Sequence, residues 1–158
     1  LAIASLTKMF GERPLGWYCR TGPSVNTRRL LVEEGGFLYD SDAYNDELPY
    51  WLTVEGKPHL VLPYSLTTND SKFGRGWFST GDDFFQFTKD AFDMLYEEGE
   101  STPKMMSIGL HCRIIGRPGR FASLVKFINY IQEFNDVWVC RRQDIAEHWI
   151  KHNKPNIL

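Results

Sequence analysis

Short apolar, β-rich runs alternate with amphipathic helical patterns along most of the chain, and this alternation restricts the possible folds more than any other feature. The strand-like runs cover residues 15–19, 37–41, 59–65, 105–111 and 137–141. The helical patterns cover residues 2–10, 24–34, 80–98, 120–134 and 143–152. Strands that alternate with helices predict an α/β fold, with about five parallel strands joined by right-handed crossovers.

Five strands are too few to close an ordinary (β/α) barrel, which takes about 250 residues. The chain has 158 residues, so the strands form either an open α/β sheet or part of a barrel. In both cases ligands should bind at the C-terminal ends of the strands, where the loops gather.

Charge and hydropathy exclude two classes of partner. The formal net charge of −2 comes without a basic stripe, so we expect no nucleic-acid partner. The longest apolar runs, such as Leu60-Val61-Leu62, are far shorter than the roughly 20 residues that span a bilayer, so we expect no membrane partner. Cys19, Cys112 and Cys140 include no CxxC pair, which argues against a zinc knuckle. Two of these cysteines lie in apolar runs that suit free thiols, so we expect a reducing, cytoplasmic location.

Polar side chains follow four of the strand-like runs. They are Arg20 and Thr21, Asp40 and Asp42, Asn69 and Asp70, and His111 and Arg113. Because the C-terminal ends of parallel strands meet at one edge, these residues are predicted to converge on one rim.

His111 suits the role of a general acid, because a histidine titrates near neutral pH. A carboxylate such as Asp42 would then fix the tautomer of the ring, and Arg20 would hold a polar substrate group with its planar fork. The alternatives are a buried histidine bonded to a backbone carbonyl and a surface arginine.

The remaining polar and aromatic candidates have equally plain structural interpretations. Asp40 and Asp42 lie two apart on a strand and so share a face, but one of them could be only a turn residue. Tyr44 and Trp51 either cover a substrate or pack the long loop over residues 42–58. Asn69 and Asp70 are most often turn formers, and His59 is interpreted as structural.

Three segments, in order, resemble motifs of the polysaccharide deacetylases, also called the NodB-homology or carbohydrate esterase family 4 group. Residues 13–24 (RPLGWYCRTGPS) resemble the third motif, residues 39–44 (YDSDAY) the fourth, and residues 107–111 (SIGLH) the fifth, whose histidine is the general acid. The resemblance implies the C-terminal part of a (β/α) barrel of the polysaccharide deacetylase type. It also implies that residues 1–158 are a single partial domain, with the first and second motifs in an N-terminal half before Leu1.

Within this superfamily, residues 23–29, 33–51, 57–70 and 103–118 look most like the cofactor-independent allantoinases. Cys112 follows the fifth-motif histidine where many deacetylases have an aspartate, which fits that branch. The tryptophan expected just after the fourth-motif aspartate is absent. The resemblance thus implies a small-molecule substrate and ring opening of allantoin to allantoate by the full-length parent, without a metal or cofactor in this chain. The implied catalytic residues are His111, Arg20 and Asp42, and the implied substrate-binding residues are Asp40, Tyr44, Trp51, Asn69 and Arg113.

Two alternatives stay open. The first is a metal-dependent deacetylase of N-acetylated glycans such as chitin or peptidoglycan, whose zinc ligands would lie in the missing half. His148 and His152 have metal-ligand spacing, but they lie on a polar helix and are not assigned as ligands. The second is a non-catalytic, truncated fragment that self-associates. Because part of a barrel exposes edge strands, we expect a homo-oligomer.

Overall fold

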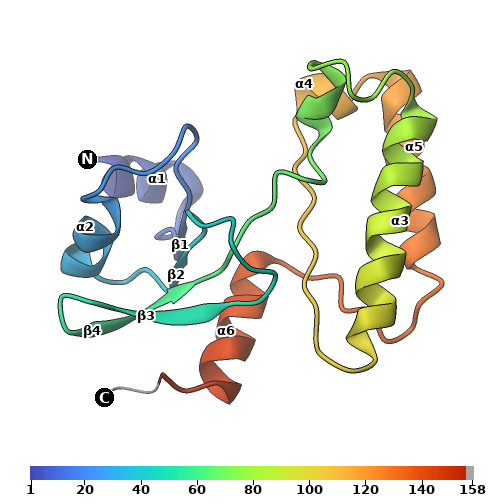
Figure 1. The fold of residues 1–158 in the computed structure, drawn as a ribbon. Coiled ribbons are helices and arrows are strands. Elements are labelled where there is room, and N and C mark those ends of the chain that lie inside the picture. Colours follow the sequence, from blue (N-terminus) through green and yellow to red (C-terminus); the bar gives the residue numbers. More distant parts are fainter. Residues whose placement is uncertain (156–158) are drawn as a thin grey trace. The chain divides into compact units, whose positions relative to one another are not determined.

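The computed structural model describes residues 1–155, which form two compact units (Figure 1). Unit 1 contains Leu1–Tyr64 and the segment from Cys140 onward, and unit 2 contains Ser65–Val139. No helix in residues 1–155 is long and apolar enough to cross a membrane.

Unit 1 is built around a mixed, four-stranded sheet in the order β1-β2-β4-β3. Strands β1 (Gly16–Trp17), β2 (Tyr39–Asp40) and β4 (Lys57–Val61) are parallel, and β3 (Tyr50–Val54) runs antiparallel to β4. Backbone bonds continue the ladder past the strand ends, from Ser41 N to Trp17 O and from Leu62 N to Asp40 O, both at 2.8 Å. The three parallel strand ends are therefore held in register.

Strand β3 lies where the sequence analysis expects an irregular loop, and that expectation is wrong. Residues Tyr50–Val54 are aromatic or β-branched apart from one leucine, a composition that favours a strand. Glu55 and Gly56 connect β3 to β4 with φ angles of 50° and 71°. Two positive φ angles in a two-residue connection are typical of the type I′ hairpin turn.

Three helices complete unit 1: α1 (Ala2–Phe10), α2 (Thr27–Glu34) and α6 (Arg142–His152). Helix α6 is tied to the sheet at both of its ends. Arg142 Nη2 donates to Ser41 Oγ at 2.9 Å and to Pro63 O at 2.8 Å. Trp51 Nε1, on β3, donates to Asn153 O at 2.6 Å.

Unit 2 is largely helical, and its two long helices, α3 (Gly81–Gly99) and α5 (Pro118–Ile131), lie side by side (Figure 1). Thr80 and Asp83 form the expected capping box at the start of α3. Two short elements, η1 (Asp70–Phe73) and α4 (Cys112–Ile115), were not expected. The core contains Phe73, Phe78, Phe84, Ile115 and Leu124.

Two of the five expected strands are absent from residues 1–155. The run over residues 105–111 makes one isolated parallel bridge, between Gly109 and Asn69, and the run over residues 137–141 makes none. A β-rich run becomes a strand only beside another strand, and Trp138 and Val139 are 58% and 70% exposed. The α/β class is confirmed, but the sheet is mixed and four-stranded, and the barrel stays a prediction.

Candidate functional site

His111 and Asp70 form a tightly bonded pair in unit 2. The Nδ1 atom of His111 lies 2.6 Å from Asp70 Oδ1. The Asp70 side chain is fully buried, whereas the His111 side chain keeps 33% of its surface exposed. An ionised carboxylate only accepts hydrogen bonds, so Nδ1 carries the hydrogen and Nε2 is left to react.

The second oxygen of Asp70 fixes the backbone around His111. Asp70 Oδ2 accepts from His111 N at 2.7 Å and from Ile115 N at 3.2 Å. Since three donors satisfy this buried carboxylate, the cost of burying its charge is offset and the imidazole is held in one orientation.

The bridge between Asn69 and Gly109 brings the two halves of this pair together. Asp70 N donates to Gly109 O, and Gly109 N donates to Thr68 O, both at 2.9 Å. Asn69 is buried and caps η1, with its side chain accepting from Ser71 N at 2.8 Å. The structure therefore gives Asn69 a turn-forming role, and its role in substrate binding stays a prediction.

The partner of His111 differs from the one that the sequence analysis suggests. Asp42 is named there as a carboxylate that could fix the tautomer of His111, but Asp70 does so in the structure. Asp70 is interpreted there only as a turn former. Its position a few residues beyond the strand-like run over residues 59–65 was the available signal, yet only the tertiary bridge brings it to His111.

A second histidine–aspartate pair lies inside unit 1. Asp40 Oδ2 accepts from Arg28 Nε at 2.7 Å and lies 2.7 Å from His59 Nε2. Burial alone would raise the pKa of Asp40, but the bonds from His59, Arg28 and the Asp42 backbone outweigh it and hold the pKa well below its usual value. His59 and Asp40 are both almost fully buried, so this pair stabilises the sheet and leaves no reactive nitrogen at the surface.

Asp42 and Tyr44, which follow β2, each contact a residue that follows β1. Asp42 Oδ1 accepts from Cys19 N at 2.7 Å, which links the segments after β1 and β2. Asp42 Oδ2 is buried and has no hydrogen-bond partner within residues 1–155. The hydroxyl of Tyr44 lies 3.1 Å from that of Tyr18.

Of three other predicted site residues, two make no side-chain hydrogen bond or ion pair within residues 1–155, and the third is bonded to a helix. The side chains of Arg20, after β1, and Arg113, in α4, are exposed and make no hydrogen bond or ion pair with other residues in 1–155. Trp51 Nε1 donates a hydrogen bond to Asn153 O, at the end of α6. The predicted rim is thus divided: Arg20, Asp40, Asp42, Tyr44 and Trp51 belong to unit 1, and Asn69, His111 and Arg113 belong to unit 2.

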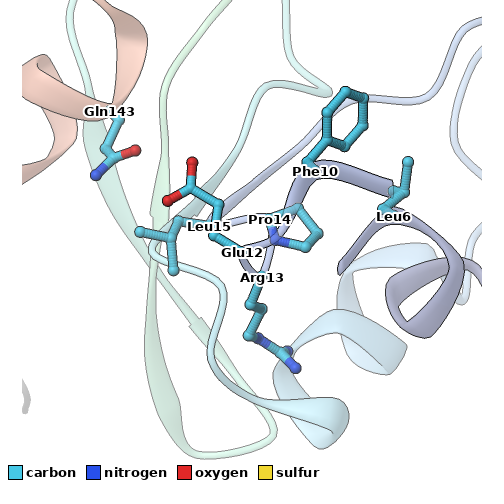
Figure 2. A pocket seen from close by; sticks show the side chains of 7 residues that line it. All are labelled: Leu6, Phe10, Glu12, Arg13, Pro14, Leu15 and Gln143. Atoms are coloured by element: carbon cyan, nitrogen blue, oxygen red, sulfur yellow. The ribbon is translucent and has the colours of Figure 1, made fainter. Parts of the chain in front are cut away.

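A pocket of about 190 Å³ lies in unit 1 (Figure 2). It is bordered by the end of α1 and the segment leading into β1. Its lining residues are Leu6, Phe10, Glu12, Arg13, Pro14, Leu15 and Gln143. Arg13 is already engaged there by Glu34 and Gly35 O, so we assign no chemistry to this pocket.

No group of three or more His, Cys, Asp or Glu side chains within residues 1–155 is arranged to hold a metal ion. The described residues therefore do not provide the donor set of a zinc site.

Comparisons with known proteins give a consistent result. No family model matches the chain. The chain is 45% identical over 153 residues to a Schizosaccharomyces pombe protein whose name assigns it to the polysaccharide deacetylases. Among solved structures, it resembles PuuE allantoinase with a TM-score of 0.90 and 58% identity. It also resembles a probable polysaccharide deacetylase from Pseudomonas aeruginosa PAO1, with a TM-score of 0.89 and 58% identity.

The extent of these matches is uneven. They cover 86% of this chain for the yeast protein and 96% for each of the two structures. They cover 47% of the yeast protein and 51% of each solved chain. The chain therefore spans about half the length of the relatives that it matches.

Proposed function

We propose that the chain is part of a hydrolase of the polysaccharide deacetylase superfamily, and that it supplies the general acid of an amide hydrolase that opens the ring of allantoin to give allantoate. The observation that carries the proposal is the pair formed by His111 and Asp70, with Nδ1 bonded to the buried carboxylate and Nε2 free to exchange a proton. The 58% identity to PuuE allantoinase supports this choice of substrate.

Hydrolysis of a cyclic amide needs one proton on the departing nitrogen. Water adds to the ring carbonyl carbon and gives up a proton to a base or to solvent, and the carbon–nitrogen bond breaks. The ring N–H takes up a proton and leaves as an NH2 group, and the acid formed at the carbon ionises to a carboxylate. His111, once protonated at Nε2, gives that proton to the nitrogen. Asp70 keeps the ring oriented while the charge on the imidazole changes.

Arg20 and Asp42 have supporting roles in this proposal. The exposed guanidinium of Arg20 has its donors available for a ureido or carbonyl oxygen. Asp42 bonds the backbone directly before Arg20, through Cys19 N, and so is a positioning residue for that segment.

The direct test compares His111→Ala and Asp70→Asn in the protein that carries this chain, with ring opening of allantoin as the readout. We expect kcat to fall by roughly 10²–10⁴-fold in His111→Ala, because general acid catalysis contributes about that much. Asp70→Asn should lower kcat and change the pH profile of kcat, with KM nearly unchanged, because the ring loses its fixed orientation.

His148→Ala is the matched control, since His148 is exposed on α6 and is not assigned to the site. It should leave kcat and KM unchanged. Unchanged turnover in His111→Ala would contradict the proposed role of His111, and no turnover of allantoin by the unaltered protein would contradict the proposed substrate.

A metal-dependent deacetylase of N-acetylated glycans is the second candidate, favoured by the names of the yeast and Pseudomonas relatives. Its zinc ligands would have to lie outside residues 1–155. Release of acetate from chitooligosaccharides that needs added zinc and stops with a chelator would favour this candidate. Allantoin turnover that persists with the chelator would favour the first.

A further inference from the structure

Three tyrosines, one after each parallel strand, gather at the C-terminal edge of the unit 1 sheet. Tyr18 follows β1, Tyr44 follows β2 and Tyr64 follows β4. The ring centres of Tyr18 and Tyr64 are 5.2 Å apart, and those of Tyr44 and Tyr64 are 6.1 Å apart. The Tyr18 and Tyr44 hydroxyls are 3.1 Å apart. We call these three residues the tyrosine cluster.

The backbone holds the tyrosine cluster in place. Tyr64 N donates to Ala43 O at 2.8 Å, which fixes the segment after β4 against the segment after β2. The hydrogen bond with Tyr44, followed by burial, raises the pKa of Tyr18 to about 12, so its hydroxyl stays protonated at neutral pH. Rings held by such contacts lose little further entropy when a ligand stacks on them.

The exposed fractions of its side chains show that the tyrosine cluster is not part of a hydrophobic core. Tyr18 and Tyr44 are 43% and 48% exposed, whereas the core ring Phe84 is fully buried. The rings of Tyr18 and Tyr44 contact the ring of Tyr64 and still face water, so they contribute little to the hydrophobic core. They offer flat, apolar faces with hydroxyl groups at their edges, which is the composition of a small-molecule binding surface.

The charge next to the tyrosine cluster restricts the ligand further. Asp42 bonds the backbone N–H of Cys19, the residue after Tyr18, and its charge is among the influences that raise the pKa of Tyr18. A carboxylate at this place favours a neutral ligand that is rich in N–H donors and disfavours an anion.

We propose that Tyr18, Tyr44 and Tyr64 form a binding subsite for a planar, uncharged ring that carries amide N–H groups, and that Asp42 makes it reject the anion formed when such a ring opens. This inference rests on the proposed function, because the ring that the subsite would bind is of the chemical class that the proposal names as the substrate. The subsite would also favour release of the product from this surface, since the substrate is neutral and the product is charged.

The test measures equilibrium binding, so it does not depend on turnover. The probes are hydantoin as the planar ring, N-carbamoylglycine as its open-chain anion and N-acetylglucosamine as a non-planar sugar. Isothermal calorimetry should give Kd values for the unaltered protein in which hydantoin binds best. Tyr44→Leu should weaken hydantoin binding about tenfold through loss of stacking. Tyr18→Phe, which keeps the ring, should weaken it about fivefold through loss of the hydroxyl.

Two further variants serve as control and as a test of charge. Tyr50→Phe removes a hydroxyl bond to Asn45 outside the tyrosine cluster and should leave the Kd for hydantoin unchanged. Asp42→Asn should tighten the binding of N-carbamoylglycine several-fold relative to hydantoin, because the repulsion is removed.

Equal hydantoin binding in Tyr44→Leu, Tyr18→Phe and Tyr50→Phe would overturn the inference, and so would tighter binding of N-acetylglucosamine than of hydantoin. Ring-opening assays run in parallel separate the two proposals. Cluster-dependent binding without allantoin turnover would support the subsite and contradict the proposed function. Turnover that is insensitive to the tyrosines would leave the function standing and remove the subsite.

Discussion

Asp40 and Asp70 are both buried carboxylates that bond a histidine, yet their surroundings give them different uses. Asp40 is bonded by Arg28 and by the buried His59, so its charge stabilises the sheet. Asp70 bonds a histidine that keeps a third of its side chain exposed, so we propose that its charge orients that histidine for catalysis. Exposure of the partner histidine, rather than the pairing itself, separates a structural pair from a candidate catalytic one.

Replacing Asp40 should change both the stability and its dependence on pH. The pKa of Asp40 is lower in the folded chain than its unfolded value of about 3.9. The stabilisation that Asp40 gives to the folded chain is therefore complete above the unfolded pKa and is lost as the pH falls through the folded pKa. Asp40→Asn should lower the free energy of unfolding by about 3 kcal/mol at pH 7, because it leaves buried partners unpaired.

Urea denaturation of the unaltered protein and of Asp40→Asn, at pH 7 and at pH 3.5, measures this difference in the free energy of unfolding. The stability difference between them should be smaller at pH 3.5. An equal difference at both pH values would show that the charge of Asp40 does not contribute.

The candidate site could be predicted from sequence only in part. His111 and the strand-end positions of Asp42 and Tyr44 are local features, because a β-rich run followed by a polar residue can be recognised without a partner. The bond from Asp70 to His111 depends on a bridge between segments that are 41 residues apart, and no local pattern encodes it. The tyrosine cluster was missed for the same reason, since its members come from three strand ends.

At the level of elements, helices were predicted more reliably than strands. The capping box of Thr80 and Asp83 and the periodicity of α3 are encoded within one segment, and both are present. Residues 105–111 and 137–141 have strand-like composition but no paired neighbour over their length in the described structure. A β-rich composition allows a segment to form a strand, but the segment forms one only where a neighbouring strand pairs with it.

The contact between α3 and α5 should be sensitive to one added methyl group. A Cβ atom on Gly81 would lie 2.8 Å from Gly119 O and 3.2 Å from Ser123 Cβ, so the two helices would have to separate. We expect Gly81→Ala to lower the free energy of unfolding by roughly 1–3 kcal/mol.

Gly99→Ala is the matched control at the other end of α3, where a Cβ atom would meet nothing within 4 Å. It should be neutral or stabilising by up to about 1 kcal/mol, because alanine restricts the unfolded chain. Thermal unfolding followed by circular dichroism measures both variants, and equal melting temperatures would contradict the close packing at Gly81.

At the level of the whole molecule, we expect self-association. Strands β1 and β3 form the two edges of the sheet, and Val139 is 70% exposed in an apolar run. Unpaired strand edges and exposed apolar side chains favour contact between copies.

Sedimentation velocity at micromolar concentration should show a species larger than a monomer. Val139→Lys should shift it toward the monomer, and Ser101→Lys, at an exposed polar position, should not. A single monomeric species for the unaltered chain would contradict the expectation.

Unit 1 is interrupted in sequence, and this affects the order in which a ribosome can complete the protein. Its sheet is made first, but Arg142, which bonds Ser41 from 101 residues away, emerges only after all of Ser65–Val139. At about 5–20 residues per second, the carbonyl groups of Leu62 and Pro63 wait several seconds for this donor. Unit 2 is continuous and contains no residue beyond Val139, so it can fold without this donor. A chain that ends at Val139 and has left the ribosome should therefore have unit 2 resistant to protease and unit 1 still open to cleavage.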